Sequence, residues 1–206
     1  MEEVKKIPDI VVRRLPLYLR TLQRMLDEKR KVTSSQELGE RSGFSAAQIR
    51  KDLSQYGEFG KQGTGYNVKF LFEKLCQILK VDQVWDIAVI GAGDIGSAIV
   101  RYQGFTNRGF RVAMIFDNDT NKIGTKINGF TVYDSSYMRE KIQESRIKIA
   151  MIAVPADHAQ EVADQLVEAG VKAILNYAPI SLNLPPEIRV QYIDPVIHLQ
   201  RMTYYL

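Results

Sequence analysis

The chain has 206 residues, 45% hydrophobic and 25% charged, with a formal net charge of +4. This is the balance of a globular protein, and the length suffices for one large domain or two small ones. No apolar run reaches the ~18 residues of a transmembrane helix, and the N-terminus lacks the apolar core of a signal peptide, so we expect a cytoplasmic protein. Cys76 is the only cysteine, which excludes an intrachain disulfide and a cysteine-rich zinc site.

The positive charge is concentrated in the first part of the chain. Residues 1–85 hold 16 of the 28 Lys and Arg residues but only 11 of the 24 Asp and Glu residues. A basic segment beside a neutral one indicates a module that binds a polyanion, although a solvated basic face would give the same counts. We therefore expect a chain of two modules.

The first module is predicted to be mainly helical. Residues 8–28 carry apolar side chains at helical spacing, and Pro16 either kinks this helix or lies in its first turn. Helix-capping sequences begin at Ser34 and at Ser45. Gly43 lies between the two short helices that these caps begin. A short helix, a Gly-containing turn and a second helix form the helix-turn-helix pattern.

A glycine-rich segment, EFGKQGTGYNV, follows the second helix of this pattern. Its glycines permit a tight β-hairpin. A hairpin in this place is the wing of a winged helix, and the apolar helix VKFLFEKLCQIL completes the module. We therefore predict a winged-helix DNA-binding domain over residues 1–80 and a linker over 81–85.

The second helix of the pattern is the predicted recognition helix. Ile49 and Leu53 are four residues apart and would face the core of the module. Basic side chains near the start of such a helix suit guanine edges and phosphates, and a wing residue could reach a phosphate or the minor groove. A solvated helix face is the alternative. The candidate DNA-contacting residues are Ser45, Gln48, Arg50, Lys51, Ser54, Lys61, Gln62, Gly63 and Tyr66.

From residue 86 onward the pattern changes to short apolar runs separated by helical or loop stretches. Continuous apolar strands that alternate with helices predict a parallel sheet covered on both faces, the doubly wound α/β class. We predict a Rossmann-like domain over residues 86–194. The apolar runs lie at 87–90, 112–116, 130–133, 147–154, 171–175 and 188–193.

The first predicted strand leads into the glycine-rich sequence GAGDIG and then into a helix. In a dinucleotide-binding turn, Gly91 would permit the tight bend, Gly93 would let the backbone approach a pyrophosphate, and Gly96 would let the helix pack close to the strand. The free N–H groups of the helix N-terminus would face the phosphates. The position between a strand and a helix makes this motif specific.

The second predicted strand ends in an acidic residue. Asp117, or Asp119 shortly after it, could hydrogen-bond the adenosine ribose and repel a 2′-phosphate, which favours NAD(H) over NADP(H). We favour Asp117, and the alternative is that it only caps a turn. Two later strand ends could line the nicotinamide half of the site or form plain turns. The candidate cofactor-binding residues are Gly91, Ala92, Gly93, Asp94, Ile95, Gly96, Asp117, Asp119, Val154, Pro155, Asn176, Tyr177, Ala178 and Pro179.

We find no catalytic constellation. A nicotinamide dehydrogenase needs a group that moves a proton, and the only histidines are His158 and His198, neither with an evident partner. We therefore expect a protein that binds its cofactor as an effector, without enzymatic activity and without a metal. Two alternatives are a small NAD-dependent dehydrogenase with a winged-helix scaffold and a repressor that responds to another nucleotide, such as coenzyme A.

Taken together, these motifs resemble the Rex family of redox-sensing transcriptional repressors over nearly the whole chain. The resemblance rests on RRLPLYLRTL, IRKDLSQYGEFGKQGTGYNV, VIGAGDIGSAIV, FDNDTNKIGT, ILNYAP and YIDPVIHLQ. It implies a homodimer that binds palindromic operator DNA of fermentation, respiration and redox-balance genes. It further implies release from the operator by NADH, whereas NAD+ permits binding.

The resemblance also implies roles for particular residues. The C-terminal helix, at 195–206, would be exchanged and pack between the two domains of the partner. Arg20, Tyr102 and Asp194 would form a switch network that reports the nicotinamide state, and Tyr102 would also contact the cofactor. In the wing, relatives often carry a basic residue where this chain has Gln62, which leaves the minor-groove role to Lys61. Some relatives carry an aromatic or aliphatic residue where this chain has Pro195, which alters the nicotinamide contact.

Overall fold

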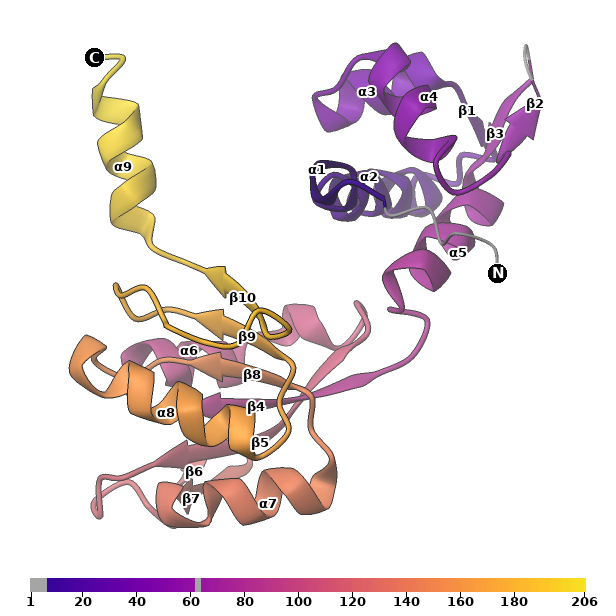
Figure 1. The fold of residues 1–206 in the computed structure, drawn as a ribbon. Helices are drawn as coiled ribbons and strands as arrows, with labels where there is room; N and C mark the ends of the chain where they lie inside the picture. The colour runs from indigo at the N-terminus through magenta and orange to yellow at the C-terminus, as the bar shows by residue number, and fades with distance from the viewer. Residues whose placement is uncertain (1–6, 62–63) are drawn as a thin grey trace, which may run out of the picture. The chain divides into compact units, whose positions relative to one another are not determined.

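The computed structural model describes residues 7–61 and 64–206. The chain divides into an N-terminal unit, Met1–Gln83, and a C-terminal unit, Val84–Leu206 (Figure 1). Helix α5 (Val68–Leu79) is the last element of the first unit, and strand β4 (Trp85–Ile90) is the first of the second. The segment between these two elements, residues 80–84, overlaps the predicted linker over 81–85, whose last residue, Trp85, begins β4.

The N-terminal unit contains helices and, among its described residues, a three-stranded antiparallel sheet in the order β1-β3-β2. Its buried core is formed by apolar side chains of α2, α3, α4 and α5. The helix-turn-helix and the hairpin of a winged helix are confirmed. Besides α5, the elements are α1 (Asp9–Val12), α2 (Leu15–Asp27), β1 (Val32–Thr33), α3 (Ser35–Ser42), α4 (Ala46–Leu53), β2 (Gly60–Lys61) and β3 (Gly65–Asn67).

Local sequence signals explain where these helices begin and end. Pro16 lies in the first turn of α2, where a missing N–H costs nothing, so the predicted helix over 8–28 is split into α1 and α2. The Ser34 side chain caps α3 by accepting a hydrogen bond from Glu37 N, and Ser45 caps α4 in the same way. Gly43 ends α3 with a φ of 83°, a conformation that favours glycine.

The C-terminal unit is built on a seven-stranded sheet with the order β10-β9-β8-β4-β5-β7-β6. Every pair is parallel except β6 with β7. This confirms the predicted doubly wound parallel sheet. The remaining elements are α6 (Asp94–Arg101), η1 (Gln103–Phe105), β5 (Phe110–Asp117), β6 (Lys126–Ile127), β7 (Phe130–Asp134), η2 (Ser135–Tyr137), α7 (Met138–Ser145), β8 (Ile149–Ile152), α8 (Ala156–Glu168), β9 (Ala173–Asn176), β10 (Arg189–Tyr192) and α9 (Pro195–Thr203).

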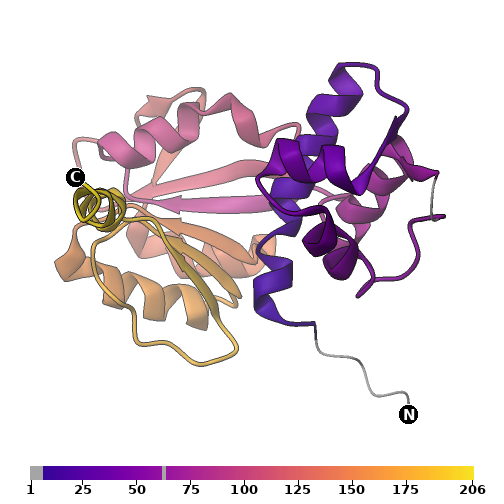
Figure 2. The ribbon, with the colours of Figure 1, turned by 90° about the horizontal axis from the view of Figure 1, so that it is seen from above.

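Both faces of this sheet are buried. Successive side chains of β4 alternate between two apolar clusters, with Ala88 and Ile90 in one and Ile87 and Val89 in the other. Helices α7 and α8 cover the first face and α6 covers the second, and Figure 2 shows α6 and α8 on opposite sides of the strands. Burial on both faces explains why the strands read as continuous apolar runs.

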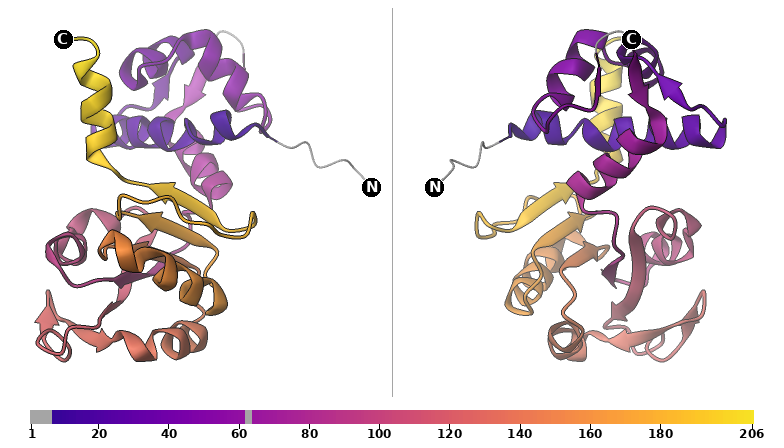
Figure 3. Two further views of the ribbon diagram at one scale, coloured as in Figure 1. Left: turned by 60° about the vertical axis from the view of Figure 1, so that its left-hand side comes forward. Right: turned by 90° about the vertical axis from the view of Figure 1, so that its right-hand side faces the viewer.

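Helix α9 follows β10 at the C-terminal end and contributes no buried residue (Figure 3). Its apolar side chains are largely exposed, with Ile197 at 61%, Leu199 at 58% and Met202 at 63%. An apolar helix is normally stable only when its apolar side is covered.

Across the described residues, the helices are all too short or too polar to cross a membrane.

Candidate nucleotide cleft and DNA-binding helix

A cavity of about 710 Å³ lies in the C-terminal unit where the strand order of the sheet reverses. Strand β4 pairs with β5 on one side and β8 on the other, so the loops after β4, β5, β8 and β9 meet at one edge of the sheet. The predicted cofactor residues that line the cavity are Gly91, Gly93, Asp94, Ile95, Asp117, Asp119, Val154, Pro155, Tyr177, Ala178 and Pro179.

The three glycines of the loop after β4 have different surroundings. Gly91 has a φ of 100°, and a Cβ there would lie 2.4 Å from the carbonyl oxygen of Ala153. A Cβ on Gly96 would lie 1.8 Å from the carbonyl oxygen of Gly91, so α6 packs directly against the loop. Gly93 has no neighbouring atom within 4 Å of that position, which leaves its backbone open to the cavity.

Gly93 is also the N-cap of α6 and forms no side-chain cap. The first N–H groups of a helix have no partner within the helix, so those of α6 are available at the cavity wall. Open backbone at Gly93 and free amides beside it are what a pyrophosphate requires. The residues present therefore fit a dinucleotide, with its phosphates at Gly93 and the start of α6.

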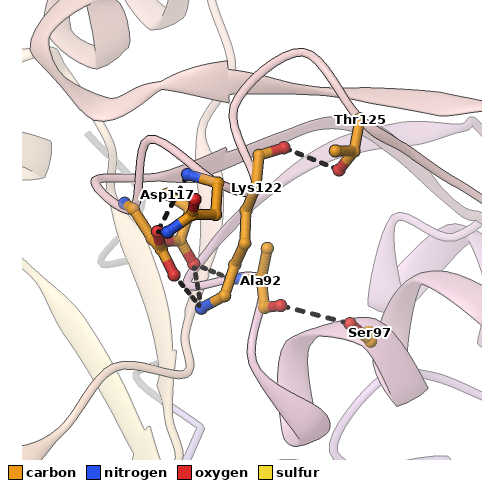
Figure 4. A network of polar contacts seen from close by, with 7 residues as sticks. Ala92, Ser97, Asp117, Lys122 and Thr125 are labelled. Carbon is orange, nitrogen blue, oxygen red and sulfur yellow. Dashed lines mark hydrogen bonds and ion pairs between the residues drawn. The ribbon is translucent and has the colours of Figure 1, made fainter.

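Asp117 ends β5 and is 8% exposed. Its Oδ2 accepts a hydrogen bond from Ala92 N at 2.6 Å and lies 3.3 Å from Lys122 Nζ, and its Oδ1 accepts one from Asp119 N at 2.8 Å (Figure 4). Burial acts to raise the pKa of Asp117, but the two backbone hydrogen bonds and Lys122 outweigh it and lower the pKa. The ionised carboxylate thereby links the end of β5 to the glycine-rich loop.

Four predicted cofactor residues lie outside this cavity wall. Ala92, within the glycine-rich loop, and Gly96, in α6, are both buried and do not line the cavity. Asn176 is fully buried and binds the loop that follows it, through hydrogen bonds with Ala178 and with the carbonyl oxygen of Ile180. Tyr102 lines an apolar cavity of about 510 Å³ that shares Ile95 and Tyr177 with the first cavity, and its ring packs edge-on against Phe105.

The cavity is also lined by residues that sequence reasoning did not identify. Lys122 lies three residues after Asp119, and this closeness in the sequence could have identified it as a candidate. The others come from helices whose position over the sheet edge is a tertiary feature. They are Ile90, Asn118, Lys122, Ser135, Met138, Ala153, His158, Glu161, Val162 and Gln165.

The recognition helix α4 presents its basic side chains to solvent. Arg50 and Lys51 are exposed, and Arg50 Nη1 donates a hydrogen bond to Ser35 Oγ at 2.8 Å. Ser45 is the exposed N-cap residue, and Ser54 is exposed at the C-cap, where its hydroxyl donates to the carbonyl oxygen of Lys51. This exposed basic face is the part of the unit suited to the major groove.

A buried ionic network joins α4 to α2, and no sequence pattern indicated it. Asp52 is 1% exposed and accepts two hydrogen bonds from Arg14, at 2.6 and 2.8 Å, and one from the Tyr18 hydroxyl at 2.7 Å. Gln48 Nε2 donates to the same carboxylate at 2.6 Å, so this predicted DNA contact is engaged within the protein. Burial acts to raise the pKa of Asp52, but its hydrogen bonds lower it.

The wing provides one described candidate side chain. Tyr66 in β3 is half-buried and packs against the apolar core of the unit, and this burial raises its pKa. Lys61 belongs to β2, but its side chain, like Gln62 and Gly63, lies outside the described residues. The predicted contacts of the wing with DNA therefore stay predictions.

The three proposed switch residues are divided between the units. Arg20 is an exposed residue of α2 in the N-terminal unit. In the C-terminal unit, Tyr102 is 53% exposed and Asp194 caps α9 by accepting a hydrogen bond from Val196 N at 2.9 Å.

Within the described part of the chain, no group of three or more His, Cys, Asp or Glu side chains could hold a metal ion.

A winged helix joined to a nucleotide-binding Rossmann-like domain defines the class of ligand-responsive DNA-binding proteins. Two family models agree with this division: "Putative DNA-binding protein N-terminus" matches residues 6–54, and "CoA binding domain" matches residues 82–180. The chain belongs to the Rex family of redox-sensing transcriptional repressors. The resemblance noted in the sequence motifs is thereby confirmed.

Individual relatives match over nearly their whole length. The chain is 53% identical to the redox-sensing transcriptional repressor Rex of Chloroflexus aurantiacus, over 100% of this chain and 97% of the relative. It is 43% identical to Rex of Brevibacillus brevis, over 100% of both chains. Among solved structures, RSP in complex with β-NAD+ and operator DNA matches at 39% identity and a TM-score of 0.93, covering 98% of this chain and 93% of that one. RSP in complex with β-NADH matches at 37% identity and a TM-score of 0.87, covering 97% and 93%.

Proposed function

We propose that this chain is a transcriptional repressor that senses the NADH/NAD+ ratio, binding operator DNA through α4 and releasing it when NADH binds. The proposal rests on the open backbone at Gly93 beside the cavity, in a chain that also carries an exposed basic recognition helix. Relatives described as redox-sensing repressors, and the RSP complexes with NADH, NAD+ and operator DNA, support the same reading. The Rex family consists of repressors and not of enzymes, which argues against the dehydrogenase alternative.

The lining of the cavity combines charged and apolar side chains. Asp117, Asp119 and Lys122 would face the adenosine ribose. The loops after β8 and β9 add apolar side chains, including Val154 and Pro179, to the same cavity, and these would contact the nicotinamide. Oxidised nicotinamide carries a positive charge that reduced nicotinamide lacks, and an apolar wall disfavours that charge. This lining supports a preference for NADH.

We also propose a homodimer, because two recognition helices about one helical turn (~34 Å) apart match the half-sites of a palindromic operator. The exposed apolar side chains of α9 support a helix that is covered by a partner subunit. The proposed domain bounds are 1–80 for the winged helix, 86–194 for the Rossmann-like domain and 195–206 for the exchanged helix. The proposed location is the cytoplasm, where both DNA and NADH are present.

The test is a fluorescence anisotropy titration with a duplex that the protein itself selects from a random pool. NADH should weaken operator binding and NAD+ should not, since a ligand shifts a two-state equilibrium only by its differential affinity. Coenzyme A is included as a third ligand because the matching family model is a CoA binding domain. Equal effects of NADH and NAD+ would contradict the proposal, and a response to coenzyme A alone would favour the other nucleotide alternative.

A further inference from the structure

The guanidinium of Arg50, on the exposed face of α4, is held by a neutral partner. Its Nη1 donates a hydrogen bond to Ser35 Oγ at 2.8 Å. Among the described residues, no acidic side chain forms an ion pair with Arg50, whereas Arg14 and Arg41 of the same unit pair with carboxylates. A hydroxyl restricts a guanidinium without neutralising it, so the positive charge of Arg50 stays available to a polyanion.

The hydroxyl of Ser35 is not needed by the helix that this residue begins. The capping hydrogen bond of α3 goes to Ser34, whose side chain accepts from Glu37 N. Ser35 is half-buried, and Figure 1 shows its helix beside α4. The bond to Arg50 therefore ties the start of α3 to the basic face of the recognition helix.

Most of the donors of Arg50 remain free for DNA. The bond to Ser35 uses one of the five N–H groups of a guanidinium. The remaining groups include Nε–H and those of Nη2, which form a bidentate edge that matches a guanine edge or a phosphate. Burial raises the pKa of Tyr66 in β3, and the positive charge of Arg50 opposes this rise, so the guanidinium also lies near the wing sheet.

Resting on the proposed function, we propose that Ser35 is a positioning residue for operator binding, which fixes the Arg50 side chain before DNA is bound. A free arginine side chain samples many rotamers, and ordering one such side chain at an interface lowers affinity about three- to tenfold. In this chain the hydrogen bond to Ser35 already restricts the side chain in the free protein. Operator binding therefore loses less conformational freedom at Arg50.

The first measurement is operator affinity, by anisotropy with the selected duplex. Ser35→Ala should weaken binding about three- to tenfold and leave its salt dependence unchanged, because the charge of Arg50 remains. Ser35→Thr keeps the hydroxyl and should restore the affinity. The matched control is Ser42→Ala, which removes a hydroxyl at the other end of α3 and should bind the operator as the unaltered chain does.

A double-mutant cycle separates positioning of Arg50 from a direct contact between Ser35 and DNA. In an Arg50→Ala background, Ser35→Ala should have no further effect. In a Lys51→Ala background it should keep its full three- to tenfold effect. Additive losses from Ser35→Ala and Arg50→Ala would contradict the inference. The urea unfolding midpoint of Ser35→Ala should stay unchanged, because alanine favours the helix and the cap at Ser34 is retained.

The second measurement needs no DNA. NMR relaxation of the Arg50 Nε–H group in the free, full-length protein reports how strongly this side chain is ordered. The order parameter should fall in Ser35→Ala and recover in Ser35→Thr. Equal order in these two variants would overturn the inference. If Ser35→Ala fails to fold, Ser35→Gly removes the same hydroxyl and provides both measurements.

The outcomes separate this inference from the proposed function. An unaltered chain that binds no duplex would overturn both. Undiminished operator binding by Arg50→Ala would overturn the inference alone, because release of the operator by NADH does not require this particular contact. Equal operator affinities of Ser35→Ala and the unaltered chain would also overturn the inference and leave the proposed function standing.

Discussion

The buried carboxylate of Asp52 contributes to the stability of the N-terminal unit. The side chain lies in the core-facing row of α4, between Ile49 and Leu53, and would be costly to bury without Arg14 and Tyr18. The network it forms fixes α4 against α2. The network thereby positions α4, the proposed recognition helix, and Gln48 takes part in the same network.

Replacing Asp52 by Asn should lower the free energy of unfolding by about 3 kcal/mol, because Arg14 loses its buried partner. The lowered pKa of Asp52 also predicts a pH effect with a definite sign. The stabilisation is present above the ordinary pKa of 3.8 and is lost as the pH falls through the lower folded-state value. Urea unfolding at pH 7 and pH 3 should show a smaller pH difference for Asp52→Asn than for the unaltered chain.

The control is Asp9→Asn, which breaks the exposed ion pair with Arg13. This change should cost less than about 0.5 kcal/mol. Equal losses in the Asp52 and Asp9 variants would show that burial does not matter at Asp52.

Two glycines of the nucleotide loop should respond differently to the same substitution. Gly96→Ala should destabilise the C-terminal unit by about 2 kcal/mol, because the new methyl group meets the carbonyl oxygen of Gly91. Gly93→Ala places its methyl group in open space at an ordinary φ of −75°, so the unfolding free energy should change by less than about 0.5 kcal/mol. Only NADH binding should fall in the Gly93 variant. Urea unfolding measures the two stability changes, and nicotinamide fluorescence measures NADH binding. Normal NADH binding by Gly93→Ala would contradict a phosphate site at the Gly93 backbone.

At the scale of the element, the exposed face of α4 is expected to bind a phosphate or a base edge of the operator DNA. Lys51→Ala should weaken operator binding and reduce its dependence on salt by about one counterion. The measurement is anisotropy at several salt concentrations. Lys69→Ala, an exposed change on α5 where the lysine pairs with Glu73, serves as the control and should have little effect. An identical salt slope for both variants would remove α4 from the interface.

Helix α9 is expected to act between subunits. Ile197→Glu combined with Leu199→Glu should leave the urea unfolding midpoint of a monomer unchanged, since neither side chain is buried within the chain. The same change should dissociate the dimer, because it places charges on the apolar surface that a partner would cover. Light scattering measures the molar mass. His198→Ala, on the same helix, should remain dimeric, and an intact dimer in the double variant would contradict the exchanged helix.

At the scale of the whole molecule, the proposed function is a coupling free energy between two binding reactions. If NADH lowers operator affinity by some factor, operator DNA must lower NADH affinity by the same factor. The Gly93→Ala protein should bind the operator and lose its response to NADH. Calorimetric titration of NADH into the protein with and without operator checks the equality. Unequal factors would indicate that DNA and NADH act on different oligomeric states.

Much of the architecture followed from local sequence patterns. Continuous apolar runs predicted the parallel sheet, because strands buried on both faces exclude polar residues. Serine caps and Gly43 predicted the helix-turn-helix, since both act through neighbouring backbone groups. The glycine-rich loop was predicted for a similar reason: the positive φ of Gly91 is a local backbone property, and Gly96 packs against Gly91, five residues before it.

The tertiary structure alone decided which polar groups meet across long stretches of sequence. Asp52 and Arg14 are 38 residues apart, and Asp117 and Ala92 are 25 apart. Their pairing depends on how helices and strands pack, which no local pattern specifies. The same holds for Gln48 and Asn176, whose residue types suited a ligand but whose positions direct them to Asp52 and to a loop. Sequence determines which groups are available, and packing determines which of them remain free for a ligand.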